Sequence, residues 1–193
     1  MYRKAHLVLA ALLLVLPSCI PARAQVEPAA TRGNVHLGIG GGIDYWRGDW
    51  GPVDRFGPSA WATAEFWHGI GIIAEGHSMD FGDGVYGARY TYYVGEGGVT
   101  YNYHHWRNVT PFVKGEMGFG GLSFPHKPTA TYTHDTRTTW AVGGGLEYKL
   151  WRRVWARADY TYDNFPNFYS PITGYHRTLN PAGFTLGFTY HLR

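Results

Sequence analysis

The sequence predicts an all-β fold in which eight antiparallel strands close into an up-and-down barrel. Three observations lead to this prediction. Apolar residues alternate with polar or small residues over eight segments, which is the two-residue period of a strand with two different faces. Short connections alternate with long ones along the chain. The charged residues share their face with most of the glycines, as expected where side chains fill a narrow barrel.

The start of the chain carries the features of a secretory signal. Arg3 and Lys4 precede a ten-residue apolar core from Leu7 to Leu16. Ala22-Arg23-Ala24 then forms a small-x-small cleavage site before Gln25. A core of this length is too short for a membrane-spanning helix, which needs about 20 apolar residues.

Cleavage at this site would divide the chain into three parts. We expect a signal peptide over residues 1–24, a flexible periplasmic leader over 25–33 and a barrel domain over 34–193. A competing cut stays open, because Leu16-Pro17-Ser18-Cys19 is similar to a lipoprotein box and would leave Cys19 lipidated. Pro17 fits that box poorly.

Loss of the signal peptide changes the charge of the chain. It removes Arg3, Lys4 and Arg23, which leaves 14 of the 17 Lys and Arg residues against 14 acidic residues, a net charge of zero. This balance gives no reason to expect a nucleic-acid partner. The sole cysteine, Cys19, would leave with the signal, so we expect no disulfide framework and no thiol nucleophile.

The first three strands are expected over residues 35–45, 60–66 and 70–77. In the first, Val35, Leu37 and Ile39 alternate with polar or glycine residues. The second alternates alanines with larger residues, and the third places Glu75 and His77 on the face opposite Ile70, Ile72 and Ala74.

The fourth and fifth strands are expected over residues 89–104 and 109–122. In the fourth, Tyr92 and Val94 hold one parity and Val99 and Tyr101 hold the other. One extra residue would return the apolar side chains of both halves to the same face, so we predict a β-bulge in Gly95-Glu96-Gly97-Gly98. In the fifth, the apolar residues lie opposite Lys114 and Glu116, and Pro111 is tolerable near the strand's start.

The last three strands are expected over residues 140–149, 154–162 and 184–192, each with the same alternation. The short connections are residues 67–69, 105–108 and 151–153. The long connections are roughly residues 47–58, 81–88, 123–137 and 163–178, which are rich in Pro, Gly, Asp and Asn. Short turns at one end and long loops at the other are typical of a barrel that spans an outer membrane.

The chemistry of the two faces also favours a barrel in lipid. A soluble sandwich, the alternative, would turn the apolar face inward and the charged face to water. Here the charged face carries the small residues and would fit inside, while the apolar face would meet lipid. Eight tryptophans gather toward the two ends, as in two interfacial girdles. We expect Trp67, Trp106, Trp151 and Trp155 at the short turns, and Trp46, Trp50, Trp61 and Trp140 near the long loops.

Residues 34–193 resemble the eight-stranded outer-membrane β-barrel family, which includes the transmembrane domain of OmpA-like proteins and the opacity-like surface proteins. The resemblance rests on Gly57 to Gly76, on Val109-Thr110-Pro111-Phe112, on Gly143 to Tyr148, and on the last strand. It implies a bacterial outer-membrane location with both termini periplasmic. The family has no common catalytic residues to carry over, and its members include anchors, adhesins and small pores.

The last strand resembles the C-terminal signal that the barrel assembly machinery reads. Thr185, Gly187, Tyr190 and Leu192 fit its polar-x-Gly-x-x-apolar-x-apolar pattern. The chain departs from the usual form because it ends in Leu192 and Arg193 rather than in a terminal Phe. The resemblance implies the assembly machinery as a partner during biogenesis and outer-membrane lipid as the surroundings.

We expect a network of charged side chains in the lumen, formed by Glu65, Glu75, Glu116, Glu147, Lys114, Lys149, Arg157 and Asp159, with Arg89 added. Buried charges must be paired or solvated. The network would therefore either plug the barrel or line a narrow hydrated channel, and eight strands leave little bore. We accordingly predict a non-enzymatic structural or surface-interaction protein, with a small passive pore as the alternative.

A lipid-active enzyme is a third hypothesis. Its nearest candidate group is Glu75, His77 and Ser78, but adjacent residues of a strand point to opposite faces, so His77 and Ser78 cannot readily pair. The histidines lack zinc-site spacing, although His126, His134 and His176 on two long loops could capture a metal weakly. We predict no cofactor and no dedicated metal site.

Partner binding would be a property of the long loops. Residues 163–178 carry Phe165, Phe168, Tyr169 and Tyr175, and residues 123–137 mix aromatic residues with His and Thr. Aromatic residues with polar neighbours suit contact with a glycan or a protein at the cell surface. The alternative is that these residues extend the upper girdle into ordered loops.

Overall fold

The computed structural model describes residues 35–47, 54–81, 90–123, 134–169 and 176–192. Nine strands are present in these ranges, and no helix in them is long and apolar enough to cross a membrane. The strands are β1 (His36–Arg47), β2 (Asp54–Trp67), β3 (Ile70–Phe81), β4 (Tyr90–Asn102), β5 (Val109–Ser123), β6 (His134–Lys149), β7 (Val154–Tyr169), β8 (His176–Leu179) and β9 (Ala182–His191).

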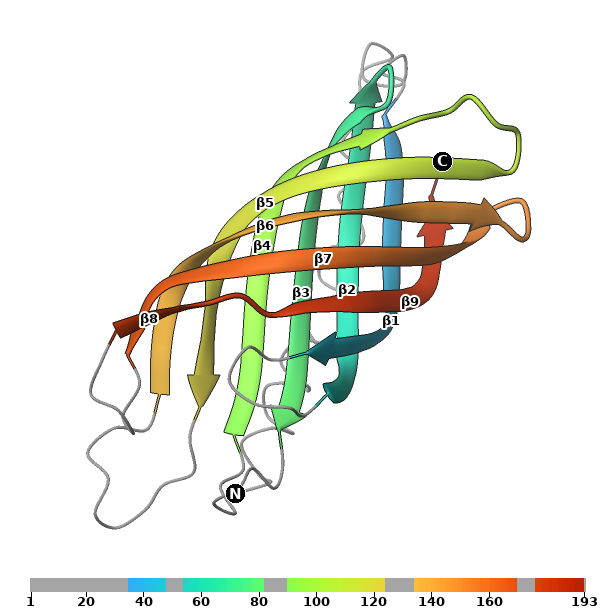
Figure 1. Ribbon diagram of the computed structural model, residues 1–193. Coiled ribbons are helices and arrows are strands. Elements are labelled where there is room, and N and C mark those ends of the chain that lie inside the picture. The colour runs from blue at the N-terminus through green and yellow to red at the C-terminus, as the bar shows by residue number, and fades with distance from the viewer. Residues whose placement is uncertain (1–34, 48–53, 82–89, 124–133, 170–175, 193) are drawn as a thin grey trace, which may run out of the picture. The chain divides into compact units, whose positions relative to one another are not determined.

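The strands form a closed antiparallel barrel. Each of β1 to β7 pairs with the next strand in sequence, and β9 pairs with both β7 and β1 (Figure 1). β8 pairs with the far end of β7 and is separated from β9 by Asn180 and Pro181, so β8 and β9 are two parts of the eighth barrel strand. Every barrel strand therefore has two neighbours, which removes the problem of an exposed sheet edge. The predicted eight-stranded up-and-down barrel is confirmed.

The apolar face of the strands points outward. Ile43 on β1 and Leu186 on β9 are each 62% exposed, whereas Asp44 on β1 is fully buried. Charged residues such as Lys114 and Arg157 lie inside. The apolar side chains therefore face outward and the charged side chains face inward, as the sequence predicts. The alternative of a soluble sandwich with an apolar interior is wrong.

The predicted β-bulge in β4 is absent from this strand, all of which is described, and this prediction was wrong. The register is continuous from Ile70↔Tyr101 to Phe81↔Tyr90 on one side of β4 and from Asn102↔Phe112 to Thr91↔Ser123 on the other. Tyr92 and Val94 simply point inward, and Val99 and Tyr101 point outward. The reason is that the interior is apolar near the end of the barrel that carries the long connections. We call the residues that fill it the apolar cluster: Trp46, Met79, Tyr92, Val94, Leu122, Phe165 and Leu179.

The predicted tryptophan girdles are correct at some positions and wrong at others. Trp67, Trp106 and Trp151 are 55% to 69% exposed beside the short turns, and Trp140 is exposed on the outer wall. Trp46 and Trp61 instead point into the lumen and are buried, and Trp155 lines an internal cavity. Their positions follow strand parity, since Trp46 shares the face of Asp44. Trp50 lies outside the described residues.

The connections at the two ends differ as the sequence suggests. Between β2 and β3, His68 and Gly69 both have positive φ, 46° and 87°, as in the type I′ turn of a two-residue hairpin. We call the end with these short connections the turn end and the opposite end the loop end. The strands run further toward the loop end than predicted, because β2 begins at Asp54, β6 begins at His134 and β7 continues to Tyr169. Parts of the predicted long loops are therefore strand.

Candidate functional site in the barrel lumen

The lumen holds a buried set of ionisable side chains from five strands. We call it the charged layer, and its residues are at most 6% exposed. They are Asp44 on β1, Glu75 and His77 on β3, Glu96 on β4, Lys114 and Glu116 on β5, and Arg157, Asp159 and Asp163 on β7. Each is at an inward position of its strand, so the alternation of the barrel brings together residues that are far apart in sequence.

Lys114 and Arg157 are the two permanent cations of this layer. The Lys114 ammonium forms ion pairs with Glu75, with Glu116 Oε2 at 3.3 Å and with Asp159 Oδ1 at 3.5 Å. Arg157 donates from Nε to Asp159 Oδ2 at 2.6 Å and from Nη2 to Glu75 Oε2 at 3.3 Å. The two cations therefore bridge β3, β5 and β7 across the interior.

The Arg157 guanidinium also lies over two aromatic rings. Its Cζ lies 4.6 Å from the ring centroid of Trp61 and 4.6 Å from that of Phe112. A planar guanidinium suits such stacking while its edge donates hydrogen bonds. Arg157 therefore fills the cross-section of the barrel as well as neutralising charge.

His77 connects the charged layer to β1. Its Nδ1 lies 2.7 Å from Asp44 Oδ2, and its Nε2 lies 3.2 Å from Glu75 Oε1. Asp44 also accepts a hydrogen bond from Thr185 Oγ1 at 2.8 Å. The first and last barrel strands are thus joined through side chains as well as through the backbone.

Toward the loop end, the apolar cluster packs against the charged layer. The Trp46 ring lies 5.4 Å from the His77 ring, measured between centroids. The Tyr92 ring lies 5.7 Å from the Phe165 ring, and the Tyr92 hydroxyl donates to Asp163 Oδ2 at 2.8 Å. Large side chains therefore fill the interior here.

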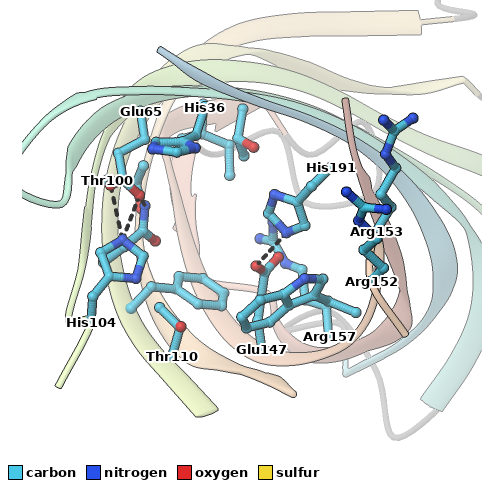
Figure 2. A pocket seen from close by; sticks show the side chains of 15 residues that line it. His36, Glu65, Thr100, His104, Thr110, Glu147, Arg152, Arg153, Arg157 and His191 are labelled. Carbon is cyan, nitrogen blue, oxygen red and sulfur yellow. Dashed lines mark hydrogen bonds and ion pairs between the residues drawn. The ribbon is translucent and has the colours of Figure 1, made fainter. Parts of the chain in front are cut away.

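Toward the turn end, the lumen widens into a cavity of about 350 Å³, which we call the mouth (Figure 2). Two acid–histidine pairs line it. His104 Nε2 lies 2.8 Å from Glu65 Oε2, and His191 Nε2 lies 3.4 Å from Glu147 Oε2. Arg157 forms part of the inner lining of the mouth. The ionisable groups of these two pairs are partly solvated, unlike those of the charged layer.

The structure brings five of the predicted lumen residues into one network and leaves three outside it. Glu75, Lys114, Glu116, Arg157 and Asp159 are joined by the ion pairs given above. Glu65 and Glu147 line the mouth. Asn102 donates a hydrogen bond to Glu65, and Thr189 donates one to Glu147. Lys149 is exposed, and its Nζ lies 5.9 Å from the Trp155 ring. Arg89 lies outside the described residues.

The residues of the predicted assembly signal occupy both faces of β9. Thr185 is buried in the lumen, and Tyr190 and Leu192 are exposed on the outer wall. Gly187 faces inward, where a Cβ would collide with the carbonyl oxygen of Gly41 and the ring of Trp61. The glycine of the pattern therefore has a packing reason of its own in this barrel.

The prediction of the lumen network left out Asp44, His77, Glu96 and Asp163. A signal for Asp44 and His77 was present, because their parity places both on the inward face. Glu96 was hidden by the wrong prediction of a bulge, since it lies inside the segment where the face was expected to change. Asp163 fell in a segment that was expected to be loop.

The group considered for catalysis is divided between the two faces of β3. His77 is buried in the lumen beside Glu75, whereas Ser78 is exposed on the outer wall. The hydroxyl of Ser78 therefore lies on the opposite side of the sheet from the imidazole of His77. His126 lies outside the described residues, and nothing is described of the His134 side chain. His176 Nδ1 lies 3.2 Å from the backbone oxygen of Asn167.

Comparison with known proteins gives one family. The family described as outer membrane protein beta-barrel domain matches residues 9–191 of the chain. No curated protein sequence matches the chain.

Three solved structures are similar in fold. The chain is 11% identical to Neisserial surface protein A, with a TM-score of 0.64 over 81% of this chain and 96% of that one. It is 18% identical to Ail, the attachment invasion locus protein of Yersinia pestis in complex with the heparin analogue sucrose octasulfate, with a TM-score of 0.54 over 83% and 99% of the two chains. It is 11% identical to a major outer membrane protein from Thermus thermophilus, with a TM-score of 0.53 over 82% of this chain and 100% of that one.

Proposed function

Because the chain belongs to the outer membrane protein β-barrel domain family, we propose that this outer-membrane barrel has a non-enzymatic structural or surface-interaction role. Its lumen is closed to ions and solutes by two successive fillings, the charged layer and the apolar cluster. The observation that carries this proposal is the burial of both sets across the same interior. Eight-stranded barrels are narrow enough for side chains to fill them.

Current recordings in planar lipid bilayers test the closed lumen. We expect no steady conductance of nanosiemens size from the folded protein. Lys114→Ala should increase the frequency of current events, because it removes the ammonium that joins Glu75, Glu116 and Asp159. Lys149→Ala is the matched control, since Lys149 lies outside this network and is exposed.

A small passive pore is the second candidate, and the mouth favours it. This cavity of about 350 Å³ reaches from the turn end to Arg157. Persistent openings of nanosiemens size in the wild-type protein would support the pore and overturn the closed lumen. The enzyme hypothesis lacks such support, because the Ser78 hydroxyl and the His77 ring lie on opposite faces of β3.

The orientation of the barrel is part of the proposal. β1 begins and β9 ends at the turn end, where Gly38 pairs with His191 and the Leu192 N–H donates to the Leu37 carbonyl oxygen at 2.8 Å. Short turns of outer-membrane barrels face the periplasm, so both ends of the barrel domain lie there. β9 would then be read by the assembly machinery as the resemblance implies. A cysteine placed at Asn108 should resist membrane-impermeant maleimide on intact cells, and labelling there would reverse the orientation.

The surface-interaction role rests on the long connections at the loop end. Phe165, one of the aromatic residues considered for it, is buried inside the barrel and is unavailable to a partner. Phe168 and Tyr169 lie at the end of β7, where their backbone pairs with β8. Tyr175 and residues 124–133 lie outside the described ranges. Replacing residues 124–133 and 170–175 with Gly/Ser sequences of equal length should abolish cell adhesion or binding of a sulfated sugar such as sucrose octasulfate. Unchanged binding by a variant that still folds would contradict the role.

A further inference from the structure

Three glutamates of the charged layer converge from three neighbouring strands. Glu75 on β3 and Glu96 on β4 are direct cross-strand partners, and Glu116 comes from β5. One carboxylate oxygen from each lies within 4.8 Å of the others. Like charges directly opposite each other on a sheet are destabilising, so a cation or a proton must offset the repulsion between the carboxylates.

Two of the three carboxylates lack hydrogen-bond donors among the described residues. Both oxygens of Glu96 and both oxygens of Glu116 are buried without a hydrogen bond, although Lys114 Nζ forms an ion pair with Glu116 Oε2 at 3.3 Å. Glu96 is 6% exposed and points at the other two glutamates. Glu75 differs, because Lys114, Arg157 and His77 already contact it. The oxygens of Glu96 and Oε1 of Glu116 are therefore the site oxygens without a hydrogen bond from a described residue or an ion pair to Lys114.

The charged layer as a whole has more acidic than basic side chains. Its nine residues comprise six carboxylates and three bases, even when His77 is counted as protonated. The three bases contact Glu75, and Lys114 also reaches Glu116, while Arg157 lies against Asp159 and His77 against Asp44. None of these ion pairs includes Glu96. Buried carboxylates without paired cations are strongly unfavourable. The formal excess of three acidic groups is therefore offset either by protonation of carboxyl groups or by a bound cation.

We propose that the lumen binds a hard divalent cation, calcium in preference to magnesium, between Glu96 and Glu116 with Glu75 as the third ligand residue. The donor set is purely oxygen, which is the set that Ca²⁺ and Mg²⁺ prefer, and Ca²⁺ tolerates irregular geometry. Oxygens on opposite sides of a Ca²⁺ ion are about 4.6–5.2 Å apart, which follows from bond lengths of 2.3–2.6 Å. The three oxygens lie within 4.8 Å of one another, so one ion of this size could contact all three. The site has no local sequence motif, because its ligand residues lie on three different strands.

Thermal unfolding of the barrel, refolded in detergent with calcium or with EDTA, tests the proposal. Refolding allows the ion to enter while the lumen forms. At a calcium concentration about 100-fold above the dissociation constant, we expect the midpoint to rise by about 5–10 °C. Glu96→Gln should abolish this rise and should raise the midpoint in EDTA, because it removes the like charge opposite Glu75. Magnesium and sodium, tested separately, should give smaller shifts.

Asp135→Asn is the matched control, since it removes a carboxylate from β6 that is paired with Arg137 and outside the three glutamates. It should retain the full calcium shift. Equal midpoints of the wild type in calcium and EDTA would overturn the proposal. So would a stability that rises on acidification alone without any dependence on calcium, since protons would then offset the charge.

Terbium luminescence gives a measurement that does not depend on the variant folding. Tb³⁺ added during refolding of the wild type should show emission sensitised by the lumen aromatic residues, with one ion per chain displaced by calcium. Emission that calcium does not displace would contradict a specific site. These results are separate from the bilayer recordings, because a lumen filled by side chains alone can be closed without a bound ion.

Discussion

The charged layer and the apolar cluster lie next to each other in one lumen and stabilise it in opposite ways. In the charged layer, Lys114 and Arg157 each contact more than one carboxylate, so the loss of one cation leaves several carboxylates with fewer partners. In the apolar cluster, Met79 and Phe165 contribute by shape and burial. One inward face can therefore serve two chemistries, and the hydrogen bond from Tyr92 to Asp163 marks the change between them.

The largest expected effect is in the charged layer. Arg157→Ala should lower the free energy of unfolding by about 3–5 kcal/mol, because it leaves Glu75 and Asp159 as buried charges with fewer partners. Urea unfolding in lipid vesicles, followed by tryptophan fluorescence, would measure it. Lys149→Ala should change the same quantity by less than about 0.5 kcal/mol. Similar losses for the two variants would remove the distinction between network and surface cations.

A cavity in the apolar cluster should have a comparable but more local effect. Met79 is 1% exposed, and Met79→Ala should cost about 2–5 kcal/mol through lost burial and an unfilled space. Met79→Leu, which nearly keeps the volume, should cost less than about 1.5 kcal/mol. If the two variants unfold at the same urea concentration, the cluster is not closely packed.

The contact between the charged layer and the apolar cluster can be tested by removing the hydroxyl of Tyr92. Tyr92→Phe keeps the ring against Phe165 and removes the hydrogen bond to Asp163. We expect a cost of about 1–3 kcal/mol, because Asp163 stays buried without that donor. Tyr92→Phe combined with Asp163→Asn should recover part of the loss in the same unfolding assay. No recovery would show that the two side chains are not coupled.

The smallest effect is expected outside the lumen. Ser78 is exposed on the outer wall, so Ser78→Ala should change the free energy of unfolding by less than about 0.5 kcal/mol. It should also leave every phenotype of the protein intact, since the hydroxyl cannot reach His77 across the sheet. Loss of a lipid-modifying activity in this variant would revive the enzyme hypothesis.

Alternation within a strand predicts which residues face the lumen where the lumen is polar. In β5, Val113 and Lys114 take the outward and inward positions that their parity predicts. In β4 the same reasoning led to a bulge that does not exist, because it assumed that every inward residue is polar or small. Tyr92 and Val94 are inward because the lumen near the loop end is apolar, and a single strand carries no sign of its neighbours' chemistry.

Two further features depend on the closed barrel and could not be predicted from the chain alone. The early start of β6 at His134 is supported by its ladder with β5, where Ser123 pairs with His134, rather than by any apolar alternation of its own. The pairing of Glu75 with Arg157 across the lumen requires the stagger of all eight strands. The sequence predicts most of the residues that face inward, but it does not specify which of them meet.

The hydrogen bond between Thr185 and Asp44 joins residues 141 positions apart, and it forms when the last strand closes against the first. Contacts of such long sequence separation form slowly, because a long loop must be closed before they contribute. A chain that stops before β9 would leave Asp44 without Thr185, and β1 without its second neighbour. A truncated copy would therefore keep exposed strand edges and a less well paired buried acid, so closure of the barrel and completion of its interior are one event.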